Sequence, residues 1–460
     1  MTTIGTDVVG ELIAQLSGRV MTAADPEYES ARVVFRGGFD GHPLAIARVA
    51  NAQDIAHVIR IAREAALPLS VRSGGHSSSG ASTNNGGLVI DLRDMAQVSF
   101  DQSGQTCWAQ SGMSAAALSQ AAWDRGQGLG FGDTGSVGIG GITLGGGIGY
   151  LTRLHGLTID NLLGAEIVTA DGDLVTADER SNPDLFWALR GGGGNFGVAT
   201  RFHYRLHAMP NFTGGLMVLP ATAETIVEFM DASAMGPEAL GTIANVMPCP
   251  PLPFVPPDIH GKLVIFALLG YAGPDDEAEN ALEPIRALKP VADMVKPQPY
   301  PQMYPPEDDS YRPLALDYTL FMDHVDHATA QTIIDRLNAS DAELRAVQLR
   351  ALGGAMARVP ADATAFAHRT APILAVAVNF WKDESDLPVR EEWLHTTVAA
   401  LDQGVPGAYV GFIREETGAR LDAAYPGSTL ERLRDLKTKW DPDNVFRRNL
   451  NIPPRTAKAA

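Results

Sequence analysis

A single imidazole stands in a glycine- and serine-rich turn at residues 70–80, which reads S-V-R-S-G-G-H-S-S-S-G. The apolar alternation of Leu67–Val71 predicts a strand that runs into this turn and presents His76 after it. Glycines let a backbone approach a ligand closely, and consecutive N–H groups form a concavity that suits phosphate. Serine hydroxyls add further donors. The turn therefore indicates an anion site around His76, although an isolated loop histidine is more often a plain surface residue.

A second stretch rich in glycine follows at Gly130–Gly149, and half of its residues are glycine. Each glycine costs backbone entropy when it is ordered, so packing alone does not account for so many. Two such loops in one chain indicate a long anionic cofactor that lies across both. A Rossmann site is disfavoured, because its fingerprint needs a helix directly after the glycines and an acidic residue about 20 positions further on.

The residues around these loops predict the elements that position them. Apolar residues at helical spacing within Asp54–Ala66 predict a helix before the His76 strand, and Gly87–Leu92 predicts a strand after it. This β-α-β-β order favours an α+β domain with its ligand loop at a strand end. Further elements are predicted at Thr6–Ser17 (helix), Pro43–Val49 (strand), Val98–Gln110 (hairpin), Ser114–Trp123 (helix), Glu166–Thr176 (strand, turn, strand), Pro183–Arg190 (helix, with Asn182 as N-cap) and Val198–Leu206 (strand).

The pattern changes at about Met209, where proline-rich stretches separate segments of strand and helix character. A chain of 460 residues can hold two domains, or one domain split by an insertion. In the tail, Thr429–Lys439 predicts a helix with Ser428 as its N-cap.

The composition narrows the class of protein. With 36 Lys and Arg against 54 Asp and Glu, the chain has a formal net charge of −18, which disfavours a nucleic-acid partner. No apolar stretch approaches the roughly 18 residues that span a bilayer, and no secretory signal is visible, so we expect no membrane association. Cys107 and Cys249 make no disulfide framework, and we expect both to be buried in a cytoplasmic protein.

Five segments together resemble one family. They are R-S-G-G-H-S at 72–77, V-G-I-G-G-I-T-L-G-G-G-I-G at 137–149, Asp160–Gly172, Asn182–Val198 and Trp440–Ile452. Their content and order are similar to those of the berberine-bridge-enzyme-like flavin oxidases. That family lies in the vanillyl-alcohol oxidase and p-cresol methylhydroxylase superfamily and includes bacterial 6-hydroxynicotine oxidases. One glycine motif alone is weak, but five in the family's order are specific.

The resemblance implies a fold and a division into domains. The fold is α+β, with a discontinuous FAD-binding domain of two subdomains, of the p-cresol methylhydroxylase type, and a substrate domain whose large antiparallel sheet is covered by helices. On this basis residues 1–208 and the returning segment 409–460 form the FAD-binding domain. Residues 209–408 form the substrate-binding cap.

The resemblance also implies FAD, with its isoalloxazine 8-methyl group joined to His76. A neutral imidazole nitrogen is a competent nucleophile toward an electrophilic flavin. No metal is expected. The other cofactor-binding residues implied by the family's motifs are Arg72, Ser73, Gly74, Gly75, Ser77, Thr134, Gly135, Ser136, Val137, Gly138, Gly140, Gly141, Gly147, Gly197, Val198, Asn449 and Asn451.

Thr134 stands where many relatives have a cysteine that forms a second flavin bond. A hydroxyl is a far weaker nucleophile than a thiolate, so we predict a single covalent link. Relatives with two links tend to have open sites for bulky substrates. Thr134 therefore favours a smaller or more enclosed substrate.

The catalytic residues depart from the family's pattern. His155 stands where relatives often have a tyrosine, and it is a polar group able to take a proton near neutral pH. Phe412 replaces the tyrosine that acts as a base in many relatives. Alcohol oxidation needs such a base, because the O–H proton must leave as the C–H hydride does, whereas a neutral amine does not. The groups that could substitute are Tyr409, Glu415, His155, Gln348 and Arg350, each of which is more often structural.

Together these features predict a covalent FAD-dependent oxidase that transfers hydride from a C–H bond of a small organic substrate to flavin N5, with reoxidation by O₂ to H₂O₂. The substrate could be an amine, an alcohol or an intermediate of secondary metabolism, and the protein a monomer or homodimer. An oligosaccharide or sugar oxidase is an alternative that Thr134 disfavours. A flavin-loaded binding protein without turnover is another, and the missing tyrosine would fit it.

Overall fold

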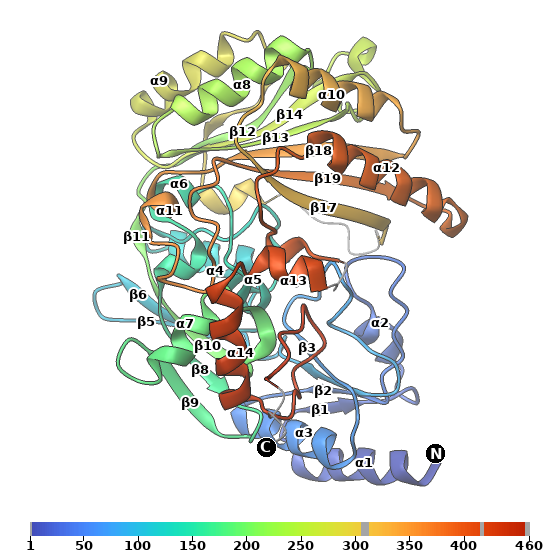
Figure 1. Ribbon diagram of the computed structural model, residues 1–460. Coiled ribbons are helices and arrows are strands. Elements are labelled where there is room, and N and C mark those ends of the chain that lie inside the picture. The colour runs from blue at the N-terminus through green and yellow to red at the C-terminus, as the bar shows by residue number, and fades with distance from the viewer. Residues whose placement is uncertain (1, 305–311, 415–417, 456–460) are drawn as a thin grey trace.

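The computed structural model describes residues 2–304, 312–414 and 418–455. Figure 1 shows two smaller sheets in the lower part of the molecule and one large sheet, with helices above it, in the upper part. The predicted α+β class is confirmed, because parallel and antiparallel sheets occur together with helices.

The first sheet carries the His76 loop at the end of one strand. Strands β2, β4 and β3 are parallel, and β1 pairs with β2 in the antiparallel direction. The strand order is β1 (Arg19–Met21), β2 (Ala45–Arg48), β4 (Leu88–Asp91) and β3 (Leu69–Arg72). The predicted helix is α3 (Ala52–Glu64), which begins earlier than expected because the Asn51 side chain accepts a hydrogen bond from Asp54 N–H and caps it.

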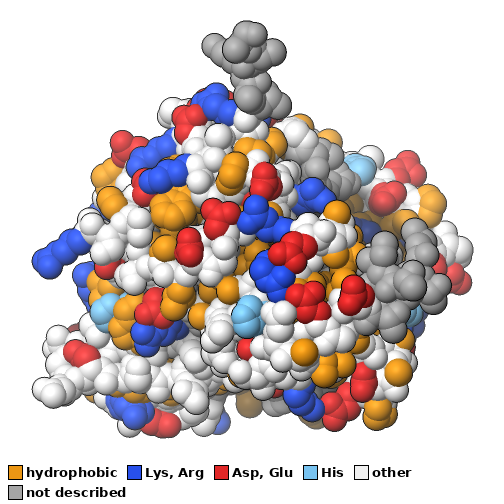
Figure 2. Space-filling view, turned by 90° about the horizontal axis from the view of Figure 1, so that it is seen from below, with side chains coloured by type: hydrophobic (Ala, Val, Ile, Leu, Met, Phe, Trp, Pro, Cys, Tyr) orange, Lys and Arg blue, Asp and Glu red, His pale blue; other side chains and the backbone are white. Residues whose placement is uncertain are grey.

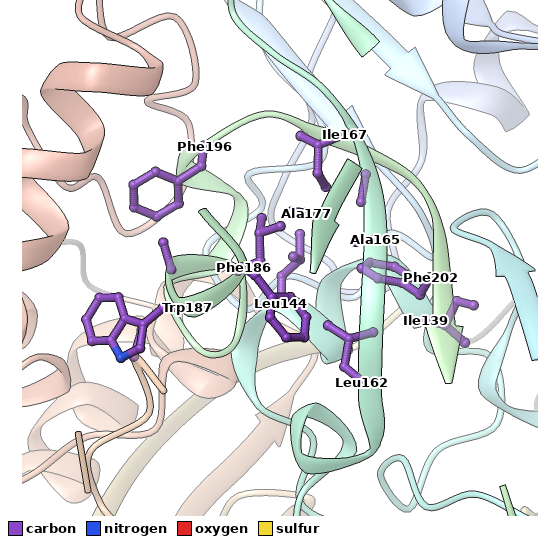
Figure 3. Close-up of a cluster of buried hydrophobic side chains, with 14 of the residues drawn as sticks. Ile139, Leu144, Leu162, Ala165, Ile167, Ala177, Phe186, Trp187, Phe196 and Phe202 are labelled. Atoms are coloured by element: carbon purple, nitrogen blue, oxygen red, sulfur yellow. The ribbon is translucent and has the colours of Figure 1, made fainter. Parts of the chain in front are cut away.

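The second sheet is antiparallel and holds the largest cluster of buried side chains in the lower part. Its strand order is β5 (Val98–Phe100), β6 (Thr106–Gln110), β10 (Val198–Arg205), β8 (Leu162–Val168) and β9 (Leu174–Asp178). Helices α4 (Ala115–Trp123), α7 (Pro183–Leu189) and α14 (Ser428–Trp440) contribute to the same core. Figure 3 shows Phe186 of α7, Phe202 of β10 and Leu144 of the second glycine-rich stretch in this cluster. The strands and helices predicted for this region are confirmed.

Three local features add to or correct the predictions. The glycine-rich stretch contains a helix, α5 (Ile139–Gly145), because Ile139 and Leu144 are buried in the core and offset the low helix propensity of glycine. Asn182 is the N-cap residue of α7, as predicted, but its backbone is left-handed and its side chain donates to the Thr176 carbonyl and makes no capping hydrogen bond. The N-cap of α14 is Gly427, and Ser428 lies inside the helix.

The third sheet is antiparallel throughout its main strands. Its order is β15 (Ala292–Asp293), β12 (Thr213–Pro220), β14 (Leu263–Tyr271), β13 (Leu240–Pro248), β18 (Leu344–Ala351), β19 (Ile373–Trp381) and β17 (Leu314–Met322), with β16 (Lys296–Pro297) also on β12. Helices α8 (Ala223–Met235), α9 (Asp275–Arg286), α10 (His327–Asn338) and α12 (Leu387–Leu401) lie on its upper face (Figure 1). The other face turns toward the lower part.

Shorter elements complete the fold. They are α1 (Thr2–Gln15), α2 (Tyr28–Arg32), α6 (Thr152–His155), α11 (Ala355–Arg358), α13 (Gly418–Ala424) and the paired strands β7 (Gln127–Gly128) and β11 (His207–Ala208). In Figure 1 the chain enters the upper part after β11 and returns with α13 and α14 to the lower part.

The returning tail is fixed by a buried ion pair. Lys437 Nζ lies 2.7 Å from Asp441 Oδ2 and donates to the carbonyls of Asn195 and Phe446, and both charged side chains are fully buried. Asp441 also accepts from the Val445 and Phe446 N–H groups. These contacts tie the tail to the loop after α7.

The surface and the cysteines agree with the composition. Figure 2 shows acidic and basic side chains interspersed over the lower face. In the part of the chain that the structure describes, no helix has the length and apolar character needed to cross a membrane. Cys107 and Cys249 are free thiols and both are buried, as predicted.

Candidate functional site

The two glycine-rich stretches cross each other through backbone contact. A Cβ built on Gly74 would lie 2.2 Å from the Gly138 nitrogen, so a side chain at this position has no room. Ser73 strengthens the crossing, because its hydroxyl donates to the Ser111 carbonyl at 2.5 Å and accepts from Gly140 N–H at 3.2 Å. The structure therefore brings together the two loops that the sequence placed about 60 residues apart.

His76 lies at this crossing, and contacts to its edge and to its face orient the ring. Its Nε2 atom is 2.7 Å from the hydroxyl oxygen of Ser136, which belongs to the second loop. Its ring stacks on Phe35 with the centroids 4.2 Å apart and an angle of 22° between the planes. One contact holds the edge of the imidazole and the other holds its face, so the ring is presented in one orientation.

Polar groups near the crossing lack partners within the described residues. The N–H groups of Gly74, Gly75 and Ser77 donate to nothing there, and they follow one another along the loop. In the tail, the buried Oδ1 atoms of Asn449 and Asn451 accept no hydrogen bond from the residues described. Asn449 Nδ2 donates to the Gly194 carbonyl at 3.0 Å, which fixes this side chain against the loop after α7. A ligand with phosphate oxygens and ring N–H groups would satisfy both sets, and FAD has both.

Other glycines of the predicted set are explained by packing. A Cβ on Gly147 would lie 2.0 Å from Thr158 Oγ1, and one on Gly197 would lie 2.5 Å from Ile167 Cγ2. Gly141 differs, because a Cβ there would meet nothing within 4 Å. Val198 is buried in β10, paired with Val168 of β8. Any cofactor contact at Val198 would therefore go through its backbone.

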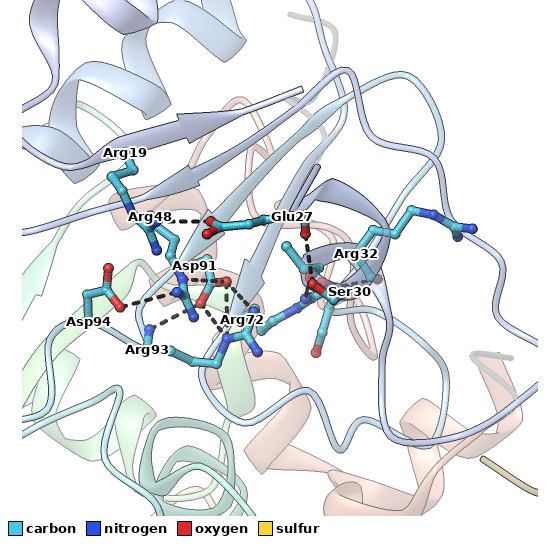
Figure 4. Close-up of polar contacts among 11 residues, drawn as sticks. Arg19, Glu27, Ser30, Arg32, Arg48, Arg72, Asp91, Arg93 and Asp94 are labelled. Carbon is cyan, nitrogen blue, oxygen red and sulfur yellow. Dashed lines mark hydrogen bonds and ion pairs between the residues drawn. The ribbon is translucent and has the colours of Figure 1, made fainter. Parts of the chain in front are cut away.

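Arg72 is a correction to the predicted cofactor set. Its guanidinium donates to the carbonyls of Ala31, Arg32 and Ser82, and the side chain is fully buried (Figure 4). Burial lowers the pKa of Arg72 to about 10, so it stays charged at neutral pH. Because its N–H groups are used by backbone carbonyls, Arg72 fixes the segment before the His76 loop instead of reaching a phosphate.

Gln348 and Arg350 lie in a hydrogen-bonded chain between the large sheet and the second glycine loop. Arg350 donates to Asp133 Oδ2 at 2.6 Å, to the Ile148 carbonyl at 2.9 Å and to Gln348 Oε1 at 2.7 Å. Gln348 Nε2 donates to Asn245 Oδ1 at 2.8 Å. Asp133 and Asn245 were missed from the sequence. Asp133 is the one ionisable residue in Gly130–Gly149, and that isolation was the available signal.

Tyr409 is close to the same loop but is not poised as a base. Its hydroxyl accepts a hydrogen bond from Gly147 N–H at 3.1 Å. Burial raises the pKa of Tyr409, although Gly147 N–H and the charge of Arg350 oppose that rise. The side chain is therefore a neutral phenol at neutral pH. Glu415, the other residue considered from this segment, lies outside the described residues.

His155 lies in a different contact group. Its ring stacks on His207 with centroids 3.7 Å apart, and its carbonyl accepts from Asn161 Nδ2. Asn161 Oδ1 in turn lies 2.6 Å from His207 Nε2. Burial, assisted by the neighbouring His207, lowers the pKa of His155 to about 4. The structure does not bring His155 together with Gln348, Arg350 or Tyr409 through any contact among the described residues.

The Thr134 side chain contacts the neighbouring carboxylate. Thr134 Oγ1 donates to Asp133 Oδ1 at 3.4 Å, and both cysteines are buried in other parts of the fold. Within residues 2–304, 312–414 and 418–455, no group of three or more His, Cys, Asp or Glu residues could hold a metal ion.

Known proteins resemble this chain over nearly all of its length. The sequence matches the FAD binding domain family over residues 43–178 and the berberine and berberine-like family over residues 408–453. An uncharacterized FAD-linked oxidoreductase of Bacillus subtilis, YgaK, is 31% identical over 96% of this chain and 98% of its own. The (R)-6-hydroxynicotine oxidase of Paenarthrobacter nicotinovorans is 30% identical over 95% of this chain and 97% of its own.

Solved structures give the same result for the fold. The crystal structure of 6-hydroxy-D-nicotine oxidase from Arthrobacter nicotinovorans has a TM-score of 0.85 and 27% identity, and the match covers 96% of this chain and 98% of that chain. A variant of berberine bridge enzyme has a TM-score of 0.86 at 21% identity, over 98% of this chain and 100% of that chain. These likenesses confirm the predicted fold of the p-cresol methylhydroxylase type.

Proposed function

The chain belongs to the berberine-like family of FAD-linked oxidoreductases, and from that premise we propose that it is an oxidase whose FAD is joined to His76 by a single covalent bond. The bound flavin supplies the redox chemistry, taking a hydride from a C–H bond of a small organic substrate and passing electrons to O₂ to give H₂O₂. The observation that carries the proposal is the fixed imidazole at the crossing of the two glycine loops.

The residues around the crossing would hold the cofactor from three sides. The N–H groups of the His76 loop, with the opposite glycine loop, would bind the pyrophosphate without a lysine. The unpartnered carbonyl oxygens of Asn449 and Asn451 would accept hydrogen bonds from ring N–H groups. Gly197 and Val198 would meet the adenine end through their backbone. The remaining members of the expected set are Ser73, Gly74, Gly75, Ser77, Thr134, Gly135, Ser136, Val137, Gly138, Gly140, Gly141 and Gly147.

The single covalent bond follows from the chemistry at Thr134. The Thr134 hydroxyl, which is hydrogen-bonded to the Asp133 carboxylate, is a poor nucleophile because threonine has no accessible anionic form at neutral pH. The buried thiols are no substitute, since burial raises the pKa of Cys107 to about 12 and also raises the pKa of Cys249. His76 is thus the nucleophile that we assign to the link.

The protonation states of the candidate catalytic residues favour an amine over an alcohol. Tyr409 is a neutral phenol at neutral pH, and burial keeps it so. His155 is also neutral, with a pKa of about 4, but such a weak base takes a proton poorly. An alcohol must give up its O–H proton during oxidation, whereas the lone pair of a neutral amine drives the loss of hydride. We therefore propose a neutral amine as the substrate type that these residues serve best.

The proposal is tested first by the mass of the denatured protein. Wild-type protein from cells with ample riboflavin should carry the mass of one FAD, and H76A should carry none. H42A, at an exposed histidine of the same subdomain, should keep the adduct. A wild-type mass equal to that of the bare polypeptide contradicts the covalent bond.

The second test is reduction of the flavin without oxygen. Amines, alcohols and sugars are added under anaerobic conditions, and loss of the flavin absorbance, with recovery in air, identifies an oxidase. Reduction by sugars alone would instead support a sugar oxidase. A covalent flavin that no compound reduces would support a binding protein without turnover.

A further inference from the structure

The inner face of the large sheet, opposite its helices, is a mostly apolar surface with one polar pair. The strand registers place Phe266, Asn245, Gln348, Val376 and Thr319 in one row across β14, β13, β18, β19 and β17. Asn245 and Gln348 are directly opposite each other in that row and are half-buried. The neighbouring inner-face residues on the same strands include Ile243, Leu268, Leu374 and Phe321.

Two buried charged side chains on this face, Asp317 and Arg350, each have an oriented partner of opposite charge. Asp317 is fully buried and lies 2.6 Å from Arg36, and Arg350 is buried and lies 2.6 Å from Asp133. A buried charge with an oriented partner contributes little net field to its surroundings. The five side chains of the row that holds the carboxamide pair are uncharged, and Arg420 of α13 lies 3.5 Å from the Thr319 hydroxyl at its far end.

Arg350 connects Asp133 to the polar pair by hydrogen bonds. Arg350 donates to Asp133 from one nitrogen and to Gln348 Oε1 from another, so the carboxylate and the carboxamide are fixed by the same planar guanidinium. Because Gln348 accepts from Arg350, its Nε2 must point to Asn245 Oδ1, as observed at 2.8 Å. The backbone carbonyl of Phe266 accepts from Asn245 Nδ2 at 3.1 Å and fixes the second amide in turn.

We propose that Asp133 is a positioning residue for substrate selection: through Arg350 it fixes the Gln348–Asn245 carboxamide pair, which selects, among neutral amines, a largely apolar substrate that also carries one amide-like group. The inference rests on the proposed function and names the substrate class of the same site. Gln348 Nε2 has a second N–H and Asn245 Oδ1 has a second lone pair, so the pair offers one donor and one acceptor.

A charged ligand gains nothing comparable from the Gln348–Asn245 pair. A carboxylate would lose its hydration and find Arg350 already paired with Asp133. An amide-like group keeps both of its hydrogen bonds and brings no charge to desolvate. Replacement of Asp133 by asparagine would leave the buried guanidinium without its counter-charge, and the surface would then favour an anion.

The experiment measures binding of three matched probes to the flavin-loaded protein: benzamide, benzoate and toluene. Binding is followed by calorimetry and by the change in flavin absorbance, so turnover is not needed. We expect benzamide to bind wild type more tightly than benzoate. Q348L should weaken benzamide about 3- to 10-fold, the effect of one lost hydrogen bond, and leave toluene unchanged.

D133N gives the signature that a merely structural role would not. Its affinity for benzamide should fall, and its affinity for benzoate should rise, because Arg350 loses its counter-charge. D160N is the matched control: it removes the carboxylate from a different buried pair, Arg369–Asp160 at 2.7 Å, and should leave the ratio of the two affinities unchanged.

Three results would overturn the inference. They are equal or tighter binding of benzoate by wild type, a benzamide affinity that Q348L leaves unchanged, and a ratio that D133N does not shift. If D133N does not fold, the inference is tested by the ratio of benzamide to benzoate affinity in wild type and by the benzamide affinity of Q348L. If no compound reduces the flavin but benzamide still binds more tightly than benzoate, the proposed oxidase activity is contradicted. The proposed role of the carboxamide pair would then remain supported.

Discussion

Gly74 and Gly138 pass each other backbone to backbone, and a Cβ on either residue would lie 2.2 Å from the nitrogen of the other. Neither neighbour is a flexible side chain, so neither can move aside. This crossing places Ser136 of one loop beside His76 of the other. The geometry of the flavin site therefore depends on two residues that make no side-chain contact at all.

The first prediction concerns the crossing itself. G138A should push the two loops apart, since its Cβ would also lie 2.1 Å from Ser73 Oγ. We expect purified G138A to contain little or no flavin, read as the ratio of flavin to protein absorbance. G10A, in an exposed turn of α1 with nothing within 4 Å, should keep its flavin and be slightly more stable, by about 0.5–1 kcal/mol. Normal flavin content in G138A would contradict the assignment.

The second prediction concerns Ser136. S136A removes the hydroxyl that lies 2.7 Å from His76 Nε2 and leaves the stack on Phe35 in place. The imidazole then loses one of its orienting contacts, so covalent attachment of FAD to apoprotein should slow while its final extent stays the same. The time course of adduct mass measures this. An unchanged rate would mean that the Ser136 hydroxyl does not orient the ring.

The third prediction concerns pH and the stacked pair His155–His207. The folded pKa of His155 is about 4 and its ordinary value is 6.5, so between these values the unfolded chain binds more protons. Stability is therefore fully present above pH 6.5 and falls as the pH drops toward 4, by about 3 kcal/mol from this residue. Burial also lowers the pKa of His207, which acts in the same direction.

Urea unfolding between pH 4 and 7 checks this. H155F keeps a ring on His207 and removes one titrating group, so its stability should vary less with pH than that of wild type. H42A, at an exposed histidine, should follow the wild-type profile. A wild-type profile that H155F reproduces in full would show that the pair does not control acid stability.

The fourth prediction concerns the buried pair Lys437–Asp441. K437M leaves the carboxylate buried without a cation and removes three hydrogen bonds, so it should cost about 3–5 kcal/mol of unfolding free energy. K382M, which breaks the exposed Lys382–Glu343 pair, should leave stability nearly unchanged. Denaturant unfolding of both variants tests the difference. Equal effects would contradict the role of the buried pair.

Local patterns made much of this fold readable from the sequence. The His76 loop follows a strand as predicted, because an apolar alternation ending in glycines is a local signal. Helix α5 could not be predicted from the sequence, because its glycines oppose helix formation and the burial of Ile139 and Leu144 is what supports it. The role of the Asn182 side chain was not predictable for a similar reason, because it donates to a strand carbonyl and makes no capping hydrogen bond.

The site was readable only in part. The glycines and His76 belong to compact motifs, whereas Asp133 and Arg350 are 217 residues apart and meet through the packing of the sheet against the lower part. Arg72 was assigned to the cofactor because it stands within a motif, and its three backbone acceptors come from segments that no local pattern connects. Long-range polar pairs of this kind leave no periodic trace in a sequence.

The tail that carries Asn449 and Asn451 is held in place by a buried ion pair far from the glycine loops in sequence. Lys437 and Asp441 dock this tail beside Asn195, and Asn449 is held against the Gly194 carbonyl next to it. A change that loosens the Lys437–Asp441 pair would therefore also move two of the residues proposed to hold FAD, although neither charge lies in the glycine loops.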